Sequence, residues 1–120
     1  MIVLKLGGSV VTEKDREETV DGAALARAAG AIGDAERGGD TGLVVVHGGG
    51  SFGPPHAETW GASTTDGVSD VEGVNAIHGA MTVLNEFVRS ALQNEGVPAV
   101  PVHPFSAAHR DGDGDLTLPS

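Results

Sequence analysis

Cysteine and tyrosine are absent from this 120-residue chain, and its other aromatic residues are one Trp and three Phe. Without cysteine, neither a disulfide framework nor a thiolate metal site can form. The hydrophobic fraction is nevertheless 39%, and it consists mostly of Val, Ala and Leu. A core of small aliphatic residues is typical of α/β proteins with close helix–sheet packing, and this length suffices for about one small domain.

Positive charge is also scarce. Lys and Arg together number 7 against 17 Asp and Glu, so the formal net charge is −10 and the isoelectric point is about 4.6. Such a chain repels a phosphate backbone or an anionic membrane surface, which argues against nucleic acid and membranes as partners. The acids are scattered, a pattern suited to a high-salt cytoplasm in which salt screens their repulsion. An ordinary acidic protein is the alternative.

No hydrophobic run approaches the roughly 18 residues that a membrane helix needs. The N-terminal apolar run over residues 2–6 is too short for a signal peptide, because two glycines interrupt it at once. We therefore expect a soluble, cytoplasmic protein.

The hydrophobic pattern alternates between strand and helix. Leu25, Ala28, Ala29 and Ile32 recur at helical spacing after an N-cap at Asp21. In chain order, we expect strands over 2–6, 43–46 and 97–102, helices over 21–37, 56–60 and 70–94, a turn over 111–115 and the start of a further strand over 116–118. The order βαβαβ predicts a parallel sheet flanked by helices.

Two of the expected strands end in glycine turns, at Gly7-Gly8-Ser9 and at residues 48–51. In a parallel sheet both turns open at the carboxyl edge, where ligands usually bind. Glycine leaves backbone N–H groups uncovered, so phosphate oxygens can approach closely. Two such sites side by side could hold two phosphates facing each other, which phosphoryl transfer requires. The alternative is that both are merely tight turns.

Lys5 and Lys14 are the only lysines, and both lie in the first 14 residues. Random placement would do this on the order of once in a hundred. Lys5 lies inside an apolar strand, a costly place for a charge without an anion nearby. The compact ammonium group suits a transferring phosphate, so we predict that both lysines are catalytic. For Lys14, an ordinary solvated loop residue is the alternative.

Other glycine motifs fit less well. Gly48, Gly50 and Gly53 have the Gly-x-Gly-x-x-Gly spacing of a dinucleotide-binding fingerprint. However, Pro54 and Pro55 stand where the following helix should begin, and no acidic residue ends a later strand at the expected distance. A Walker A motif is absent from the sequence.

No metal-binding residue is expected. The histidines lack a convincing ligand spacing. Asp111, Asp113 and Asp115 look like the start of a calcium loop, but Leu116 stands where glycine is required and no Glu follows.

A family resemblance joins these motifs. The segments that carry it are KLGGS at 5–9, Lys14, VVVHGGGSFG at 44–53, AIHGAM at 76–81, Leu84-Asn85 and VPAV at 97–100. The first three resemble the amino acid kinase superfamily, and the Ser-Phe-Gly extension with the later segments resembles the archaeal isopentenyl phosphate kinases. The resemblance covers nearly all of this chain. On the side of the family, it covers only about the first half of such an enzyme.

The resemblance implies a three-layer α/β/α sandwich with a mainly parallel sheet. Residues 1–120 would be the N-terminal, substrate-binding lobe, without the ATP-binding C-terminal lobe, and we expect this fragment alone to be inactive. The implied reaction is transfer of the γ-phosphate of ATP to isopentenyl phosphate, with Mg²⁺ as cofactor and a homodimer as the assembly.

The resemblance also implies roles for individual residues. Lys14 would stabilise the transition state, and Lys5 and His56 would be the other catalytic residues. The residues implied for the phosphates of ATP are Lys5, Gly7, Gly8, Ser9 and Gly50. Those implied for the substrate are Gly48, Gly49, Pro54, His56, Ile77 and Met81. For Ile77 and Met81, ordinary core packing is the alternative.

The chain departs from the family at one position. Directly after Phe-Gly the family has a histidine that binds the accepting phosphate, whereas this chain has Pro54, which offers no donor. We expect His56 to reach the same phosphate; otherwise the activity is weakened or lost. The rival functions are an amino acid, carbamate or UMP kinase of the same superfamily, a truncated module that only binds or dimerises, and a dinucleotide-binding domain.

Overall fold

The structure is a computed structural model. The residues that it describes are 1–39, 42–59, 71–103, 109–110 and 116–117, with the backbone alone at 56–58 and in the last two ranges. None of the helices in this described part combines the length and hydropathy needed to cross a bilayer.

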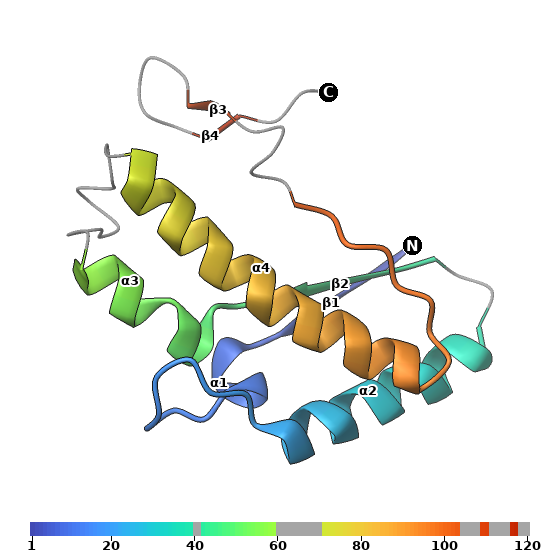
Figure 1. Ribbon diagram of the computed structural model, residues 1–120. Coiled ribbons are helices and arrows are strands. Elements are labelled where there is room, and N and C mark those ends of the chain that lie inside the picture. Colours follow the sequence, from blue (N-terminus) through green and yellow to red (C-terminus); the bar gives the residue numbers. More distant parts are fainter. Residues whose placement is uncertain (40–41, 60–70, 104–108, 111–115, 118–120) are drawn as a thin grey trace.

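A pair of parallel strands forms the central sheet. β1 (Ile2–Leu6) pairs with β2 (Leu43–His47), in a register that sets Ile2 opposite Leu43 and Leu6 opposite His47. β-branched and aliphatic residues dominate both strands, a composition typical of buried parallel strands. In this structure, however, four of the five residues of β1 are exposed. Because the strands are parallel and in step, their carboxyl ends lie side by side at one edge (Figure 1).

The helix α2 (Gly22–Arg37) connects the two strands. It begins after Asp21, whose Oδ1 accepts a hydrogen bond from the Ala24 N–H at 3.0 Å, and it ends at Gly38. The predicted N-cap and the predicted end are both confirmed. The predicted apolar face is confirmed as well, with Leu25, Ala29 and Ile32 buried.

The long helix α4 (Val71–Asn94) packs against α2. Its predicted first residue, Asp70, lies outside the described residues, and the helix ends where predicted. Gly96 closes it in the left-handed conformation with φ 80°, and the Val97 N–H donates to the Leu92 carbonyl at 3.0 Å. The glycine is needed because other residues adopt this conformation only at a cost.

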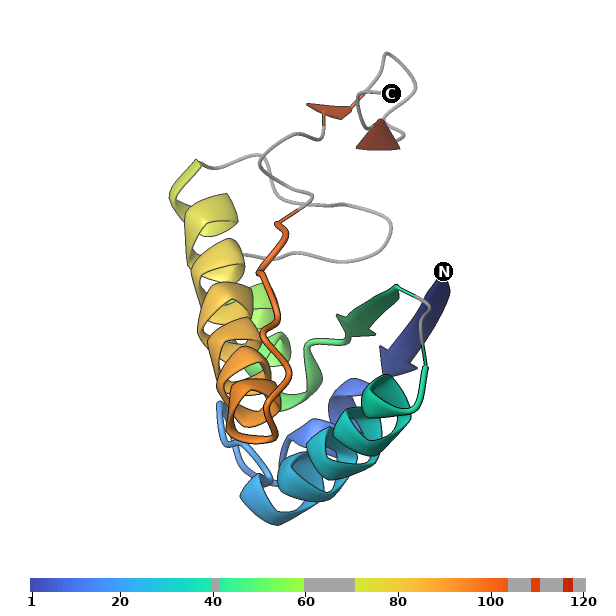
Figure 2. The same ribbon diagram turned by 90° about the vertical axis from the view of Figure 1, so that its right-hand side faces the viewer.

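The core lies between these helices and one face of the sheet. Leu6, Leu84 and Val88 are buried in it, and Leu43 and Val45 of β2 pack against it. On the other face of the sheet, Val3, Val44 and Val46 remain 66%, 42% and 45% exposed. Figure 2 shows α2 and α4 on the same side of the strands.

The parallel α/β architecture is therefore confirmed. Of the three layers, the described part of the chain contributes the sheet and the helical layer on one of its faces.

The strand predicted over 97–102 is wrong. This segment is irregular, and Val100 and Val102 are 81% and 77% exposed. The valines of this segment favour a strand, but Pro98 and Pro101 have no N–H to donate to a sheet. β3 (His109–Arg110) and β4 (Leu116–Thr117) form a separate antiparallel pair. β4 falls within the strand predicted over 116–118, whereas the predicted turn at 111–115 lies outside the described residues.

The cap of α2 leads to a stability prediction. Asp21→Ala should lower the free energy of unfolding by about 1 kcal/mol, because the Ala24 N–H loses its acceptor. Asp21→Asn, which keeps a side-chain oxygen, is the matched control and should change it by a few tenths at most. Urea unfolding followed by circular dichroism measures both. Equal losses in the two variants would show that the hydrogen bond is not what stabilises this end.

Candidate functional site: two adjoining glycine loops

The first glycine loop opens a helix rather than a simple turn. Gly7 is the N-cap of α1 (Gly8–Val11), a four-residue helix that sequence reasoning missed. A stretch of four residues is too short to show helical periodicity. Ser9, predicted to bind ATP, lies exposed in α1.

The second glycine loop follows β2 at the same edge of the sheet. Gly48 and Gly49 lead into the 3₁₀ helix η1 (Gly50–Phe52), which is followed by α3 (Pro54–Thr59). The predicted helix at 56–60 thus begins two residues earlier, at a proline. Proline is well suited to the first turn of a helix, where its missing N–H would have had no partner.

The two loops touch backbone to backbone. A Cβ atom added to Gly8 would lie 2.6 Å from Gly50 Cα, and one added to Gly48 would lie 3.0 Å from the Gly8 nitrogen. A Cβ on Gly50 would lie 2.5 Å from the Gly8 oxygen, and φ at Gly50 is 51°. No other residue type fits these positions without displacing backbone. The prediction that the two loops lie side by side at one edge of the sheet is therefore confirmed.

Thr12 lies at the junction of the two loops, and sequence reasoning gave it no role. Its side chain is buried, and its Oγ1 donates to the Gly8 carbonyl at 2.7 Å. The same oxygen accepts a hydrogen bond from the Ser51 N–H at 3.0 Å. Nothing in the sequence marks this threonine, because its partner Ser51 is 39 residues away.

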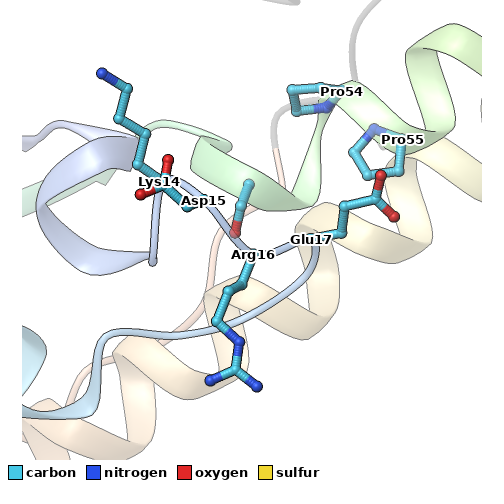
Figure 3. A pocket seen from close by; sticks show the side chains of 7 residues that line it. Lys14, Asp15, Arg16, Glu17, Pro54 and Pro55 are labelled. Atoms are coloured by element: carbon cyan, nitrogen blue, oxygen red, sulfur yellow. The ribbon is translucent and has the colours of Figure 1, made fainter.

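Lys14 lies on a loop that folds back beside the second glycine loop. The Glu13 N–H donates to the Thr19 carbonyl at 2.8 Å, and a bridge between Thr12 and Val20 closes the loop. Lys14 is exposed on it, and Figure 3 shows Lys14 and Arg16 extending in opposite directions.

An open pocket of about 180 Å³ lies between this loop and the start of α3 (Figure 3). The residues lining it are Lys14, Asp15, Arg16, Glu17, Ser51, Pro54 and Pro55. The pocket thus joins Lys14 to the Pro54 segment, in which this chain departs from the family that it resembles.

Lys5 occupies the open face of the sheet. It is opposite Val46 in the register, and it is exposed next to the carboxyl end of β1. The predicted cost of burying its charge therefore does not arise in this structure, because no helix of the described chain covers that face. The contact of Lys5 with the phosphates of ATP stays a prediction.

The departure at Pro54 has a structural consequence. Pro54 and Pro55 begin α3. Because proline has no N–H, neither contributes a backbone donor beside the second glycine loop. The backbone of His56 lies in the same helix, but its side chain lies outside the described residues.

α4 reaches the second glycine loop from the core side. A Cβ on Gly49 would lie 3.2 Å from both the sulfur and the methyl carbon of Met81. Met81 is half-buried and also packs against the core, and Ile77 lies half-buried one turn before it. Both the substrate role and the packing role predicted for these residues are compatible with this position.

His47 anchors the start of the same loop. Its Nδ1 lies 3.0 Å from the Gly48 oxygen, and its Nε2 lies 2.9 Å from Oδ1 of Asn85 on α4. These contacts fix the ring between the loop and the helix. Asn85 is a further site residue to which sequence reasoning assigned no role of its own.

Besides the two lysines, the charged residues at the site are Asp15, Arg16 and Glu17 of the pocket. Among the described residues, no group of three or more His, Cys, Asp or Glu could hold a metal ion. On α4, a hydrogen bond from Arg89 lowers the pKa of Glu86, and the same bond raises the pKa of Arg89. Backbone amides of the loops, with the Lys14 ammonium group beside them, would suit an anion.

The sequence is similar to curated isopentenyl phosphate kinases. The one from Haloferax volcanii is 56% identical over 119 residues, which cover 99% of this chain and 47% of that protein. The one from Methanothermobacter thermautotrophicus is 40% identical over 128 residues, covering 98% of this chain and 47% of that protein. The chain spans about half the length of the curated relatives that it matches.

Solved structures give the same result. A structure described as "X-ray structures of isopentenyl phosphate kinase" matches all of this chain and 50% of its own, with a TM-score of 0.81 and 37% identity. An isopentenyl phosphate kinase substrate complex matches 93% of this chain and 45% of its own, with a TM-score of 0.70 and 33% identity. The family model of the amino acid kinase family matches residues 1–117. With its parallel strands and paired glycine loops, the chain belongs to the amino acid kinase family.

Proposed function

We propose that this chain is the acceptor-binding half of an ATP-dependent phosphotransferase, and that the acceptor is isopentenyl phosphate. The observation that carries the proposal is the backbone contact between the two glycine loops, at Gly8 and Gly50, beside the loop of Lys14. Two glycine loops this close could hold two phosphates at the separation that in-line transfer needs. The relatives' names supply the identity of the acceptor.

The two loops would bind different phosphates. The first loop, with Gly7, Gly8 and Ser9, would hold the phosphates of ATP together with Lys5 and Gly50. Gly49 would hold the phosphate of the acceptor. The Gly48 N–H already donates to the Leu6 carbonyl at 3.1 Å, so Gly48 would contribute by letting the phosphate approach closely. Lys14 would neutralise the charge that develops on the transferring group.

No general base is needed in this reaction, because the acceptor is already a phosphate anion. Mg²⁺ would enter bound to the phosphates of ATP and would neutralise their charge. This fits the described residues, which offer amides and ammonium groups rather than a carboxylate cluster.

The apolar part of the substrate would extend towards α4. Met81 lies against Gly49, and Ile77 is one turn away on the same helix. A flexible thioether beside the phosphate loop is a suitable wall for a short prenyl chain. From the family resemblance we also propose a homodimer.

Pro54 supports a second proposal, a descendant that binds ligands without catalysis. The chain has Pro54 where its family has a donor to the accepting phosphate, and the nitrogen of a proline cannot replace that donor. In the catalytic proposal His56, two residues further along α3, supplies the missing donor.

A chimaera separates these two proposals. We expect activity with isopentenyl phosphate and ATP when residues 1–120 replace the matching half of the Haloferax volcanii relative. In that chimaera Lys14→Met should lower kcat about 100-fold or more, because a transition-state charge is no longer neutralised. Production of isopentenyl diphosphate measures both.

The matched control is Arg27→Met, which removes an exposed cation of α2. It should leave kcat within about twofold, as is usual for exposed substitutions away from a site. A well-folded chimaera that binds isopentenyl phosphate without transferring phosphate would favour the binding-only proposal. Activity with an amino acid, carbamate or UMP instead would exclude the proposed acceptor.

Gly50→Ala tests the contact between the loops. The new methyl group would collide with Thr12 Oγ1 and the Gly8 carbonyl, so we expect unfolding to become easier by about 1–3 kcal/mol. Isopentenyl phosphate binding to the chain should be lost, as measured by calorimetry. In the control Gly79→Ala, an added Cβ meets no atom within 4 Å and should stabilise α4. Unchanged binding in Gly50→Ala would contradict the phosphate role of this contact.

The acidic surface suits a high-salt cytoplasm, which we propose as its setting. Raising KCl from about 0.1 M to about 1 M shortens the Debye length from about 10 Å to about 3 Å, so the unfolding temperature should rise. Glu36→Lys, at an exposed position of α2, changes the net charge of −10 by two units and should reduce this response. A melting temperature that is independent of KCl would contradict the proposal.

A further inference from the structure

Thr12 is the one buried polar residue among the described residues, at 2% exposure. Its hydroxyl both donates and accepts: it donates to the Gly8 carbonyl and accepts a hydrogen bond from the Ser51 N–H. A buried hydroxyl with both roles satisfied holds its two partners at a defined separation. Here the partners belong to the two different glycine loops.

The contact with Ser51 is the one that only the hydroxyl can make. The Gly8 carbonyl already accepts the Thr12 N–H at 3.0 Å, as part of α1. Loss of the hydroxyl would therefore leave the Gly8 carbonyl bonded but would remove the acceptor of the Ser51 N–H. The hydroxyl also lies directly against Gly50, where an added Cβ would strike it.

Ser51 in turn is hydrogen-bonded to the loop that carries Lys14. Its carbonyl accepts the Glu18 N–H at 2.9 Å. Its Oγ accepts the Thr19 N–H and donates to the Thr19 carbonyl, both at 3.3 Å. Glu18 has a φ of 49°, a conformation that a non-glycine residue keeps only where its surroundings impose it. The Lys14 loop is thus attached to the second glycine loop through Ser51.

We propose that Thr12 is a positioning residue for phosphoryl transfer. Its hydroxyl sets the spacing of the two phosphate-holding loops, and through Ser51 it orients the loop that carries Lys14. This inference rests on the proposed function. It differs from a packing role, which would belong to the methyl group of the same side chain.

The test compares Thr12→Val with Thr12→Ser in the full 120-residue chain. Valine keeps the shape and removes the hydroxyl, whereas serine keeps the hydroxyl and removes the methyl group. In Thr12→Val we expect hydrogen exchange of the Ser51 amide to quicken about tenfold or more, and isopentenyl phosphate affinity to fall about tenfold. In Thr12→Ser both should stay within about threefold of wild type. Exchange and titration are followed by NMR.

Ser51→Ala isolates the second half of the proposal. It keeps the amide that bonds to Thr12 but loses the hydroxyl that holds Thr19. In the chimaera with the Haloferax volcanii relative, kcat should fall about tenfold while KM for isopentenyl phosphate changes less than about threefold. A merely structural role would not produce this split between kcat and KM.

The outcomes separate the two proposals. A wild-type chain that binds no isopentenyl phosphate would refute the proposed function and with it the role of Thr12. Normal binding by wild type and by Thr12→Val alike would overturn this inference alone. Equal losses in the valine and serine variants would assign the effect to the methyl group and overturn it too. If Thr12→Val does not fold, as judged by circular dichroism, an unchanged kcat in Ser51→Ala overturns the proposal.

Discussion

The rest of the site depends on one constraint, the contact of two backbones where Gly8 meets Gly50. No side chain separates them, so the first turn of α1 and the 3₁₀ turn of η1 lie in direct contact. This requires β1 and β2 to be parallel and in step, since a slip in register would move one loop away from the other. The packing of α2 and α4 on one face of the sheet maintains that register.

The same edge of the sheet contains the feature that sets this chain apart. In the proposed function, both glycine loops and the Lys14 loop bind phosphates. At position 54 the family resemblance implies a hydrogen-bond donor, whereas Pro54 begins α3 and has no N–H to donate. A proline is well placed for the helix and poorly suited to an anion, so the helix start and the ligand contact make opposing demands on one position.

Several elements could be predicted from local sequence because their causes are local. The N-cap at Asp21, the closing Gly96 and the apolar face of α2 each depend on residues within about one or two turns. The strand predicted over 97–102 failed because its two prolines outweigh its valines. The four-residue helix α1 was missed, since no periodicity can appear over so short a stretch.

By itself the sequence determined the αβ order, the two glycine loops on one edge and the scarcity of lysine that draws attention to Lys5 and Lys14. Only the tertiary structure decided that Lys5 lies on the open face of the sheet and that Met81 rests on Gly49. It alone singled out Thr12, whose hydroxyl bonds across 39 residues to Ser51. A threonine has the same local pattern wherever it occurs, and its partner is set by how distant segments pack.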